Sequence, residues 1–181
     1  MRWSPKRRTI HWLFSRRNIS RCPRAVNARC YDSLVRPNLE YASSVWDPYT
    51  MVSIQQLEAV QRCAARFVSG DYHTTSSVSH MMCTIDWKFL QHRHQLSKLV
   101  MMYRITNQLV AIHLTFFCHY KMPSPRIHDP FCRTDIYSRS YIPSTIRLWN
   151  HMPHEVVTSP TLDTFKAWVA TLEVWVHHSM F

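Results

Sequence analysis

The clearest pattern along the chain is a run of hydrophobic positions at helical spacing between residues 53 and 70. The positions that face the same way are Ile54, Leu57, Val60, Gln61, Ala64, Phe67 and Val68. A recurrence every three or four residues places them on one side of an α-helix. Gln56 stands three residues after Ser53, as in a capping box, and Gly70 stands where a left-handed residue would end the helix. The pattern therefore predicts an amphipathic helix from about Ser53 to Gly70.

Further helices are predicted on both sides of this one. A second long helix is expected from about Trp87 to Gln108, where hydrophobic and basic residues alternate at helical spacing. Shorter helices are expected over Pro23–Leu34, Ser77–Cys83 and Pro143–Asn150, with Pro23 at a first helical position. A final helix is expected after Ser159 and Pro160, with Asp163 in its first turn, and is predicted to run to about Trp175.

The stretch between residues 111 and 139 breaks the helical pattern. It contains Pro123, Pro125 and Pro130 and shows no clean period, which is typical of an irregular connection. We therefore predict an all-α fold, in which a helical bundle is followed by a Pro-rich connection and a small C-terminal helical module. The expected ranges are a basic lead-in at 1–22, a helical domain at 23–110, the connection at 111–139, the C-terminal module at 140–175 and a tail at 176–181.

Glycine content excludes several classes of enzyme. The chain has a single glycine, Gly70. Dinucleotide-binding, P-loop and serine-hydrolase motifs each need several glycines for close approach of the backbone. A chain with so few glycines is also not expected to form the tight turns of an all-β fold.

Positive charge is concentrated at the start of the chain. The formal net charge is +11. The first 36 residues carry ten basic side chains and one acid, Asp32, so they hold +9 of that charge. Trp3, Trp12 and Phe14 are interleaved with these basic residues. Basic side chains with aromatic neighbours suit a polyanion such as nucleic acid, and a solvated basic face is the alternative interpretation.

Cysteine spacing and hydropathy bear on the compartment. The six cysteines form no CxxC pair and no dense framework, which favours thiols in a reducing intracellular compartment, the nucleus or the cytoplasm. No apolar stretch reaches the length of a membrane span, so no membrane association is expected. Because residues 1–31 carry nine basic side chains and no acid, a mitochondrial presequence is a minor alternative.

Three blocks of the sequence resemble one family in the same order. The first comprises KRRTIHWLFSRRNISRCPRAV at 6–26, RPNLEYASSVWDPYT at 36–50 and IQQLEAVQRCAARFVSGDY at 54–72. The second is SVSHMMCTIDWKFLQHRHQLSKLVMMYRITNQLVAI at 77–112, and the third is CRTDIYSRSYIPSTIRLWNHMPHEVVTSPTLDTFKAWV at 132–169. Together they are similar to the region after the catalytic palm in the reverse transcriptases of non-LTR (LINE-type, jockey- or CR1-like) retrotransposons. The resemblance covers about residues 6–169.

The resemblance implies a thumb-like helical domain that holds nucleic acid, without the chemistry of the polymerase. The parent polymerase needs Mg²⁺ held by clustered carboxylates. This chain has no two adjacent acidic residues, and its seven Asp residues are isolated. The chain by itself is therefore expected to be no enzyme and to need no cofactor. Its expected partners are RNA or an RNA/DNA duplex, bound with low specificity, and the missing palm of the parent polymerase.

Six arginines are the candidate phosphate contacts. They are Arg16, Arg17, Arg21 and Arg24 in the basic lead-in and Arg62 and Arg66 on the main helix. Phosphate contacts of this kind position a duplex and carry little sequence information. The alternative for Arg62 and Arg66 is a solvent-facing stripe paired with Glu58. A separate set of aromatic residues, Tyr41, Trp46 and Trp149, is expected to pack in the core and to use one polar atom each, with base stacking as the alternative.

Two other functional classes stay open at this stage. Twelve His and six Cys supply many possible metal ligands, but none of their spacings matches a zinc finger or a zinc knuckle. A Cys–His nucleophilic pair is conceivable, although no spacing favours it. The chain could also be a relic without function, or a helical protein-interaction module that binds no nucleic acid.

Overall fold

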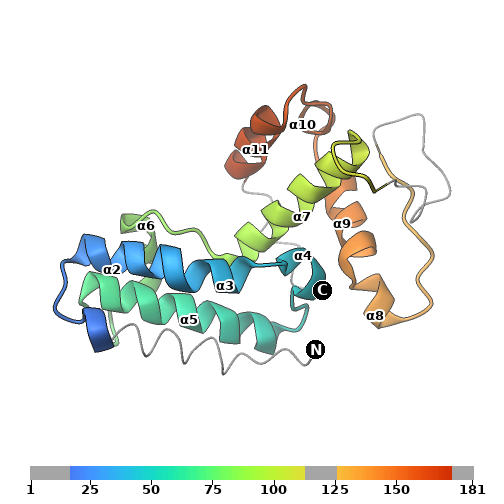
Figure 1. The fold of residues 1–181 in the computed structure, drawn as a ribbon. Coiled ribbons are helices and arrows are strands. Elements are labelled where there is room, and N and C mark those ends of the chain that lie inside the picture. Colours follow the sequence, from blue (N-terminus) through green and yellow to red (C-terminus); the bar gives the residue numbers. More distant parts are fainter. Residues whose placement is uncertain (1–16, 113–125, 173–181) are drawn as a thin grey trace. The chain divides into compact units, whose positions relative to one another are not determined.

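The computed structural model describes residues 17–112 and 126–172, and Figure 1 shows their arrangement. Every regular element of these residues is helical, so the predicted all-α class is confirmed for this part of the chain. The chain divides into two compact units, unit 1 (Met1–Arg93) and unit 2 (His94–Phe181). The division falls within one helix, α7, and each unit is described below by itself.

Unit 1 is built around a long central helix, α5 (Met51–Ser69). A second rod lies against α5 and consists of α2 (Arg24–Cys30), a π-helical segment η1 (Tyr31–Val35) and α3 (Arg36–Glu40). The rod and α5 run in opposite directions, so the start of α2 lies beside the end of α5 (Figure 1). The described part of the unit also contains the short helices α4 (Ser43–Trp46), before α5, and α6 (Val78–Thr84), after it.

The described residues of unit 2 form most of α7 (Leu90–Thr106) and four shorter helices. These are α8 (Asp135–Ser138), α9 (Tyr141–Asn150), α10 (His154–Val157) and α11 (Leu162–Thr171). The short helix α8 lies inside the stretch that the sequence predicted to be irregular, and residues 113–125 of that stretch are outside the described residues.

Each unit has its own hydrophobic core. In unit 1, Tyr31, Val35 and Leu39 of the rod meet Leu57, Val60 and Phe67 of α5, together with Met81 and Met82 of α6. In unit 2, Leu99, Met102 and Tyr103 of α7 meet Ile146 and Trp149 of α9 and Phe165 of α11. Burial of these side chains at helical spacing explains why the periodic segments of the sequence became helices.

The predicted helix ends were partly wrong. The main helix does end at Gly70, which adopts φ +69°. It begins earlier than predicted, at Met51, and Thr50 occupies the cap position, so Ser53 and Gln56 form no capping box there. The last helix is capped by Thr161 and not by Ser159, because Thr161 and Thr164 bond to each other's backbone N–H groups. The helix ends at Thr171, since Leu172 is extended, so the predicted end at about Trp175 was wrong.

The rod in unit 1 continues past a proline. The prediction ended this helix at Leu34, whereas helical backbone runs on to Glu40. Pro37 stands in the first turn of α3, and proline can occupy that turn because its missing N–H leaves no helical bond unmade there. The π-turn before it, in which the Arg36 N–H bonds to the Tyr31 carbonyl, shifts the hydrogen-bond register just ahead of Pro37. The proline is therefore accommodated within one rod.

Candidate nucleic-acid interface

Two of the candidate arginines lie at the same end of unit 1. Arg24 is exposed in the first turn of α2. Its Nη2 atom would be 3.7 Å from a Cβ atom placed on Gly70, the residue that ends α5. Arg66 belongs to the last turn of α5 itself. A helix C-terminus carries partial negative charge, so cations at this place also stabilise α5.

The side chain of Arg66 is hydrogen-bonded to the loop that follows α5. Its Nη1 donates to the carbonyl oxygen of His73 at 2.8 Å, and the loop is closed by a hydrogen bond of 2.9 Å from the His73 N–H to Asp71 Oδ1. Hydrogen bonds from Ser76 and from the His73 backbone hold the pKa of the Asp71 carboxyl below its usual range. Arg66 is half-buried and shapes this turn, so only part of its guanidinium faces solvent.

The other described candidates are exposed. Arg17 has helical backbone ahead of α2, and Arg21 lies in the turn that follows it, which the hydrogen bond from the Cys22 N–H to the Ile19 carbonyl closes at 3.0 Å. Arg62 lies one helical turn before Arg66 on α5. Within residues 17–112 and 126–172, no ion pair involves Arg17, Arg21, Arg24 or Arg62. Arg16 lies outside the described residues.

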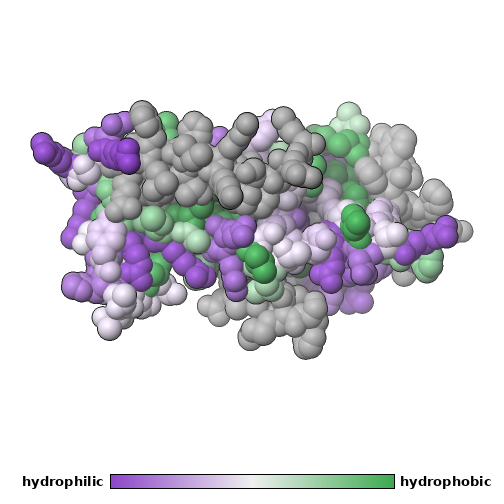
Figure 2. Space-filling model, turned by 90° about the horizontal axis from the view of Figure 1, so that it is seen from below, coloured by the Kyte–Doolittle hydropathy of each residue, from purple (hydrophilic) through white to green (hydrophobic). Residues whose placement is uncertain are grey.

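We call Arg17, Arg21, Arg24, Arg62 and Arg66 the arginine end of unit 1. Figure 2 shows hydrophilic side chains at the left of its view, the side on which α2 begins and α5 ends in Figure 1. Four of the five residues expose their charge to solvent, which is the arrangement that phosphate contacts require.

The alternative interpretation, in which Arg62 and Arg66 form a solvent-facing stripe paired with Glu58, was wrong about Glu58. Glu58 is buried, and its Oε1 accepts a hydrogen bond of 2.9 Å from the N–H of Gln91 in the first turn of α7. The carboxylate therefore satisfies one of the free N–H groups at that helix start, as acids in a first helical turn do.

The three aromatic residues that were predicted to pack in the core differ in their burial. Trp149 is buried in the core of unit 2, as predicted, at 5.8 Å between ring centroids from Phe165. Trp46 is half-buried and donates its Nε1–H to the carbonyl oxygen of Tyr41 at 2.5 Å, also as predicted. Tyr41 is 78% exposed, so its predicted place in the core was wrong.

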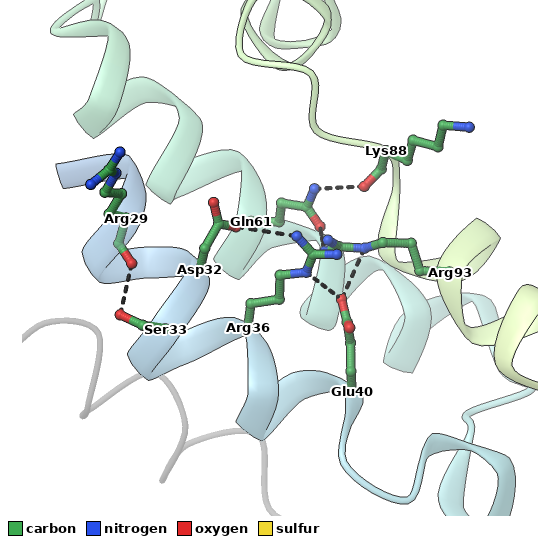
Figure 3. Close-up of polar contacts among 8 residues, drawn as sticks. All are labelled: Arg29, Asp32, Ser33, Arg36, Glu40, Gln61, Lys88 and Arg93. Atoms are coloured by element: carbon green, nitrogen blue, oxygen red, sulfur yellow. Dashed lines mark hydrogen bonds and ion pairs between the residues drawn. The ribbon is translucent and has the colours of Figure 1, made fainter. Parts of the chain in front are cut away.

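A partly buried polar network in unit 1 is the main feature that sequence reasoning missed (Figure 3). Glu40, at the end of α3, lies between two arginines: its Oε1 is 3.0 Å from Arg36 Nε and 3.0 Å from Arg93 Nε. Arg36 also reaches Asp32 at 3.4 Å, one turn earlier on the rod. The spacing of Asp32, Arg36 and Glu40 at i, i+4 and i+8 is the sequence signal that could have indicated the first part of this network.

Gln61 extends the network across unit 1. Its side chain is fully buried and donates from Nε2 to the Lys88 carbonyl at 2.8 Å, while its Oε1 accepts from Arg93 Nη2 at 3.3 Å. Burial lowers the pKa of Arg93, and the nearby Glu40 carboxylate opposes that effect. Burial raises the pKa of Tyr31, which packs on Trp87 beside the network. The network holds the rod, α5 and the start of α7 together.

The described residues contain no group of three or more His, Cys, Asp or Glu side chains that could hold a metal ion. In the same ranges, 17–112 and 126–172, no helix is long and apolar enough to cross a membrane. Compared with protein-family models, curated proteins and solved structures, the chain matches none of them.

Proposed function

We propose that this chain binds nucleic acid with low sequence specificity, through the arginine end of unit 1. We propose further that it is the thumb and post-thumb part of a LINE-type reverse transcriptase, without the catalytic palm. The observation that carries the binding proposal is the exposure of Arg17, Arg21, Arg24 and Arg62 without a carboxylate partner among the described residues. The three-block resemblance supports the origin.

The chemistry of these side chains suits a phosphate backbone. A guanidinium stays charged at any physiological pH and offers several donors in one plane to phosphate oxygens. Contacts of this kind recognise the shape and charge of a duplex and not its bases. Each phosphate that is neutralised releases condensed counterions, so the affinity falls as salt rises.

The test is the salt dependence of duplex binding by the full chain. A labelled RNA/DNA hybrid is titrated with the protein at several salt concentrations, and the dissociation constant is followed by fluorescence anisotropy. We expect log K to fall linearly with log salt, with a slope of about −0.9 for each phosphate contacted. The double variant Arg17→Gln/Arg21→Gln should weaken binding and make the slope shallower by about 2.

A matched control removes the same charge elsewhere. Arg104 and Lys166 are residues of unit 2 that belong to neither proposed nucleic-acid surface, and Arg104→Gln/Lys166→Gln changes the net charge by the same amount. The control should bind the hybrid with nearly the affinity of the unaltered chain. Equal losses in both double variants would mean that only overall charge matters, and no loss in either would contradict the proposal.

A second candidate function is a protein-interaction surface. Five large hydrophobic side chains between residues 41 and 52 are exposed: Tyr41, Val45, Tyr49, Met51 and Val52. Three of them lie within residues 36–50 of the resemblance and the other two directly follow it, and the missing palm of the parent polymerase is the partner that the resemblance implies. Binding through such a surface should change little with salt, because it depends on apolar burial. Salt dependence therefore separates the two candidates.

A further inference from the structure

The segment at residues 126–139 of unit 2 is fixed to α9 at two places. Near its start, Asn150 forms two hydrogen bonds with the main chain of Ile127: its Oδ1 accepts from the N–H at 2.9 Å, and its Nδ2 donates to the carbonyl at 2.7 Å. Near its end, Arg147 donates to both the hydroxyl and the carbonyl oxygen of Ser138. The segment is therefore presented in a defined conformation.

Between these two anchors the segment exposes large hydrophobic side chains. Phe131 is 87% exposed, the highest value of any large hydrophobic residue in the described chain. Ile136 is 77% exposed and Tyr137 is 42% exposed, both on the short helix α8. Thr134 caps this helix by accepting a hydrogen bond from the Tyr137 N–H at 3.3 Å, so Ile136 and Tyr137 sit on helical backbone. Single exposed hydrophobic residues are common, but three within seven positions are a patch.

The charged side chains beside this patch carry a small positive excess, which complements a negatively charged partner. Arg126, Arg133 and Arg139 are exposed in the segment, together with the acids Asp129 and Asp135. The segment thus carries a net charge of +1 before any contribution from His128. A weak positive charge beside exposed aromatic rings matches single-stranded nucleic acid, where stacked bases supply much of the affinity and phosphates supply the rest.

We propose that the 126–139 segment is a stacking platform for single-stranded nucleic acid, with bases stacked on Phe131 and Tyr137 and phosphates near Arg133. The inference concerns a second surface and a different form of nucleic acid from the duplex contacts of the arginine end. It stands on residues of unit 2 alone, so it does not depend on the function proposed above.

The experiment compares two labelled single strands that share the same phosphates. One is an oligouridylate about twelve nucleotides long, within the span that one binding surface of this kind covers, and the other is an abasic strand of equal length. Anisotropy titrations of the full chain should show tighter binding to the strand with bases. Because stacking provides the difference, we expect a shallower salt dependence than for the RNA/DNA hybrid.

Substitutions at Phe131 separate stacking from charge. Phe131→Ala should weaken binding of the oligouridylate about tenfold and leave binding of the abasic strand unchanged. Phe131→Trp should keep the affinity, and the fluorescence of the added indole should be quenched when bases stack on it. Trp168 is a matched control, since it is an exposed aromatic residue of the same unit on α11, and Trp168→Ala should leave both affinities nearly unchanged.

Several results would overturn the inference. Equal binding of the two strands would show that charge alone is recognised, and an unchanged affinity in Phe131→Ala would remove the platform. If Phe131→Ala changes the sedimentation of the protein without nucleic acid and leaves oligouridylate binding unchanged, the patch serves contact between copies of the chain. If Phe131→Ala has no effect while Arg17→Gln/Arg21→Gln weakens hybrid binding, only the arginine end binds nucleic acid.

Discussion

The side-chain amide of Gln61 donates a hydrogen bond to the main-chain carbonyl of Lys88 at 2.8 Å, across 27 positions of the sequence. The same side chain accepts a hydrogen bond from Arg93, which lies in the first turn of α7. One buried residue of α5 therefore binds both the segment before α7 and the start of that helix. Glu58, three positions earlier on α5, reaches the N–H of Gln91 at 2.9 Å. Two polar residues on the buried face of α5 thus determine where α7 begins relative to it in unit 1.

Gln61→Ala should destabilise the protein. The substitution leaves the Lys88 carbonyl and part of the Arg93 guanidinium without their partner in a buried place, and we expect a loss of about 1–3 kcal/mol in the free energy of unfolding. Urea unfolding followed by circular dichroism measures it. Gln55→Ala, on the exposed side of the same helix, is the control and should change the value by less than about 0.5 kcal/mol. Equal effects of the two substitutions would contradict the role of Gln61.

Glu40→Gln should also destabilise the fold. Arg93, whose side chain is only 11% exposed, would lose the carboxylate 3.0 Å from its Nε, and a buried charge left without its partner costs about 1–3 kcal/mol. The comparison is Asp163→Asn, which breaks the exposed pair between Asp163 and Lys166. That pair should be worth less than about 1 kcal/mol, because solvent screens it. Thermal unfolding of both variants would show whether burial makes the difference.

The free energy of unfolding should fall in mild acid, because His92 takes up a proton more readily in the unfolded chain. Burial lowers the pKa of this half-buried imidazole, and the nearby positive charges of Lys88 and Arg93 lower it further. The unfolded chain then binds a proton more readily than the folded chain, from the ordinary histidine pKa of about 6.5 downwards. The contribution of neutral His92 is thus complete above that pH and is lost as the pH falls below it.

The test for His92 is the pH dependence of unfolding between about pH 7.5 and 5. His92→Gln cannot take up the proton, so its free energy of unfolding should change less with pH than that of the unaltered chain. His80 is exposed, and His80→Gln should keep the original dependence. Parallel curves for the unaltered chain and His92→Gln would rule out this assignment.

Tyr103→Phe should weaken unit 2. The hydroxyl of Tyr103 donates to the carbonyl oxygen of Ser159 at 2.6 Å in a buried place, and its ring stacks on Phe165 at 4.5 Å between centroids. Loss of the donor leaves the carbonyl unsatisfied while the ring packing stays, so we expect a cost of about 1–2 kcal/mol. Tyr137→Phe removes the same hydroxyl from an exposed side chain and should be nearly neutral in the same denaturation experiment.

The sequence by itself determined the all-α class of the described residues and the course of their main helices. Apolar residues at helical spacing specify the buried face of α5, and Gly70 ends it because glycine adopts a positive φ with little strain. The cap of α6 at Ser77 followed from local chemistry in the same way, since its side chain accepts from the His80 N–H. These features depend on residues a few positions apart, which is why they could be predicted.

Only the tertiary structure decided which polar residues are buried and which aromatic residues are not. One interpretation of the sequence paired Glu58 with Arg62 and Arg66 in a solvent-facing stripe, yet Glu58 is buried and its carboxylate accepts from the N–H of Gln91 in the first turn of α7. Tyr41 was predicted to pack in the core, but it is 78% exposed in the described chain. Such outcomes depend on contacts between segments far apart in the sequence, and hydrophobic periodicity carries no information about which of these segments meet.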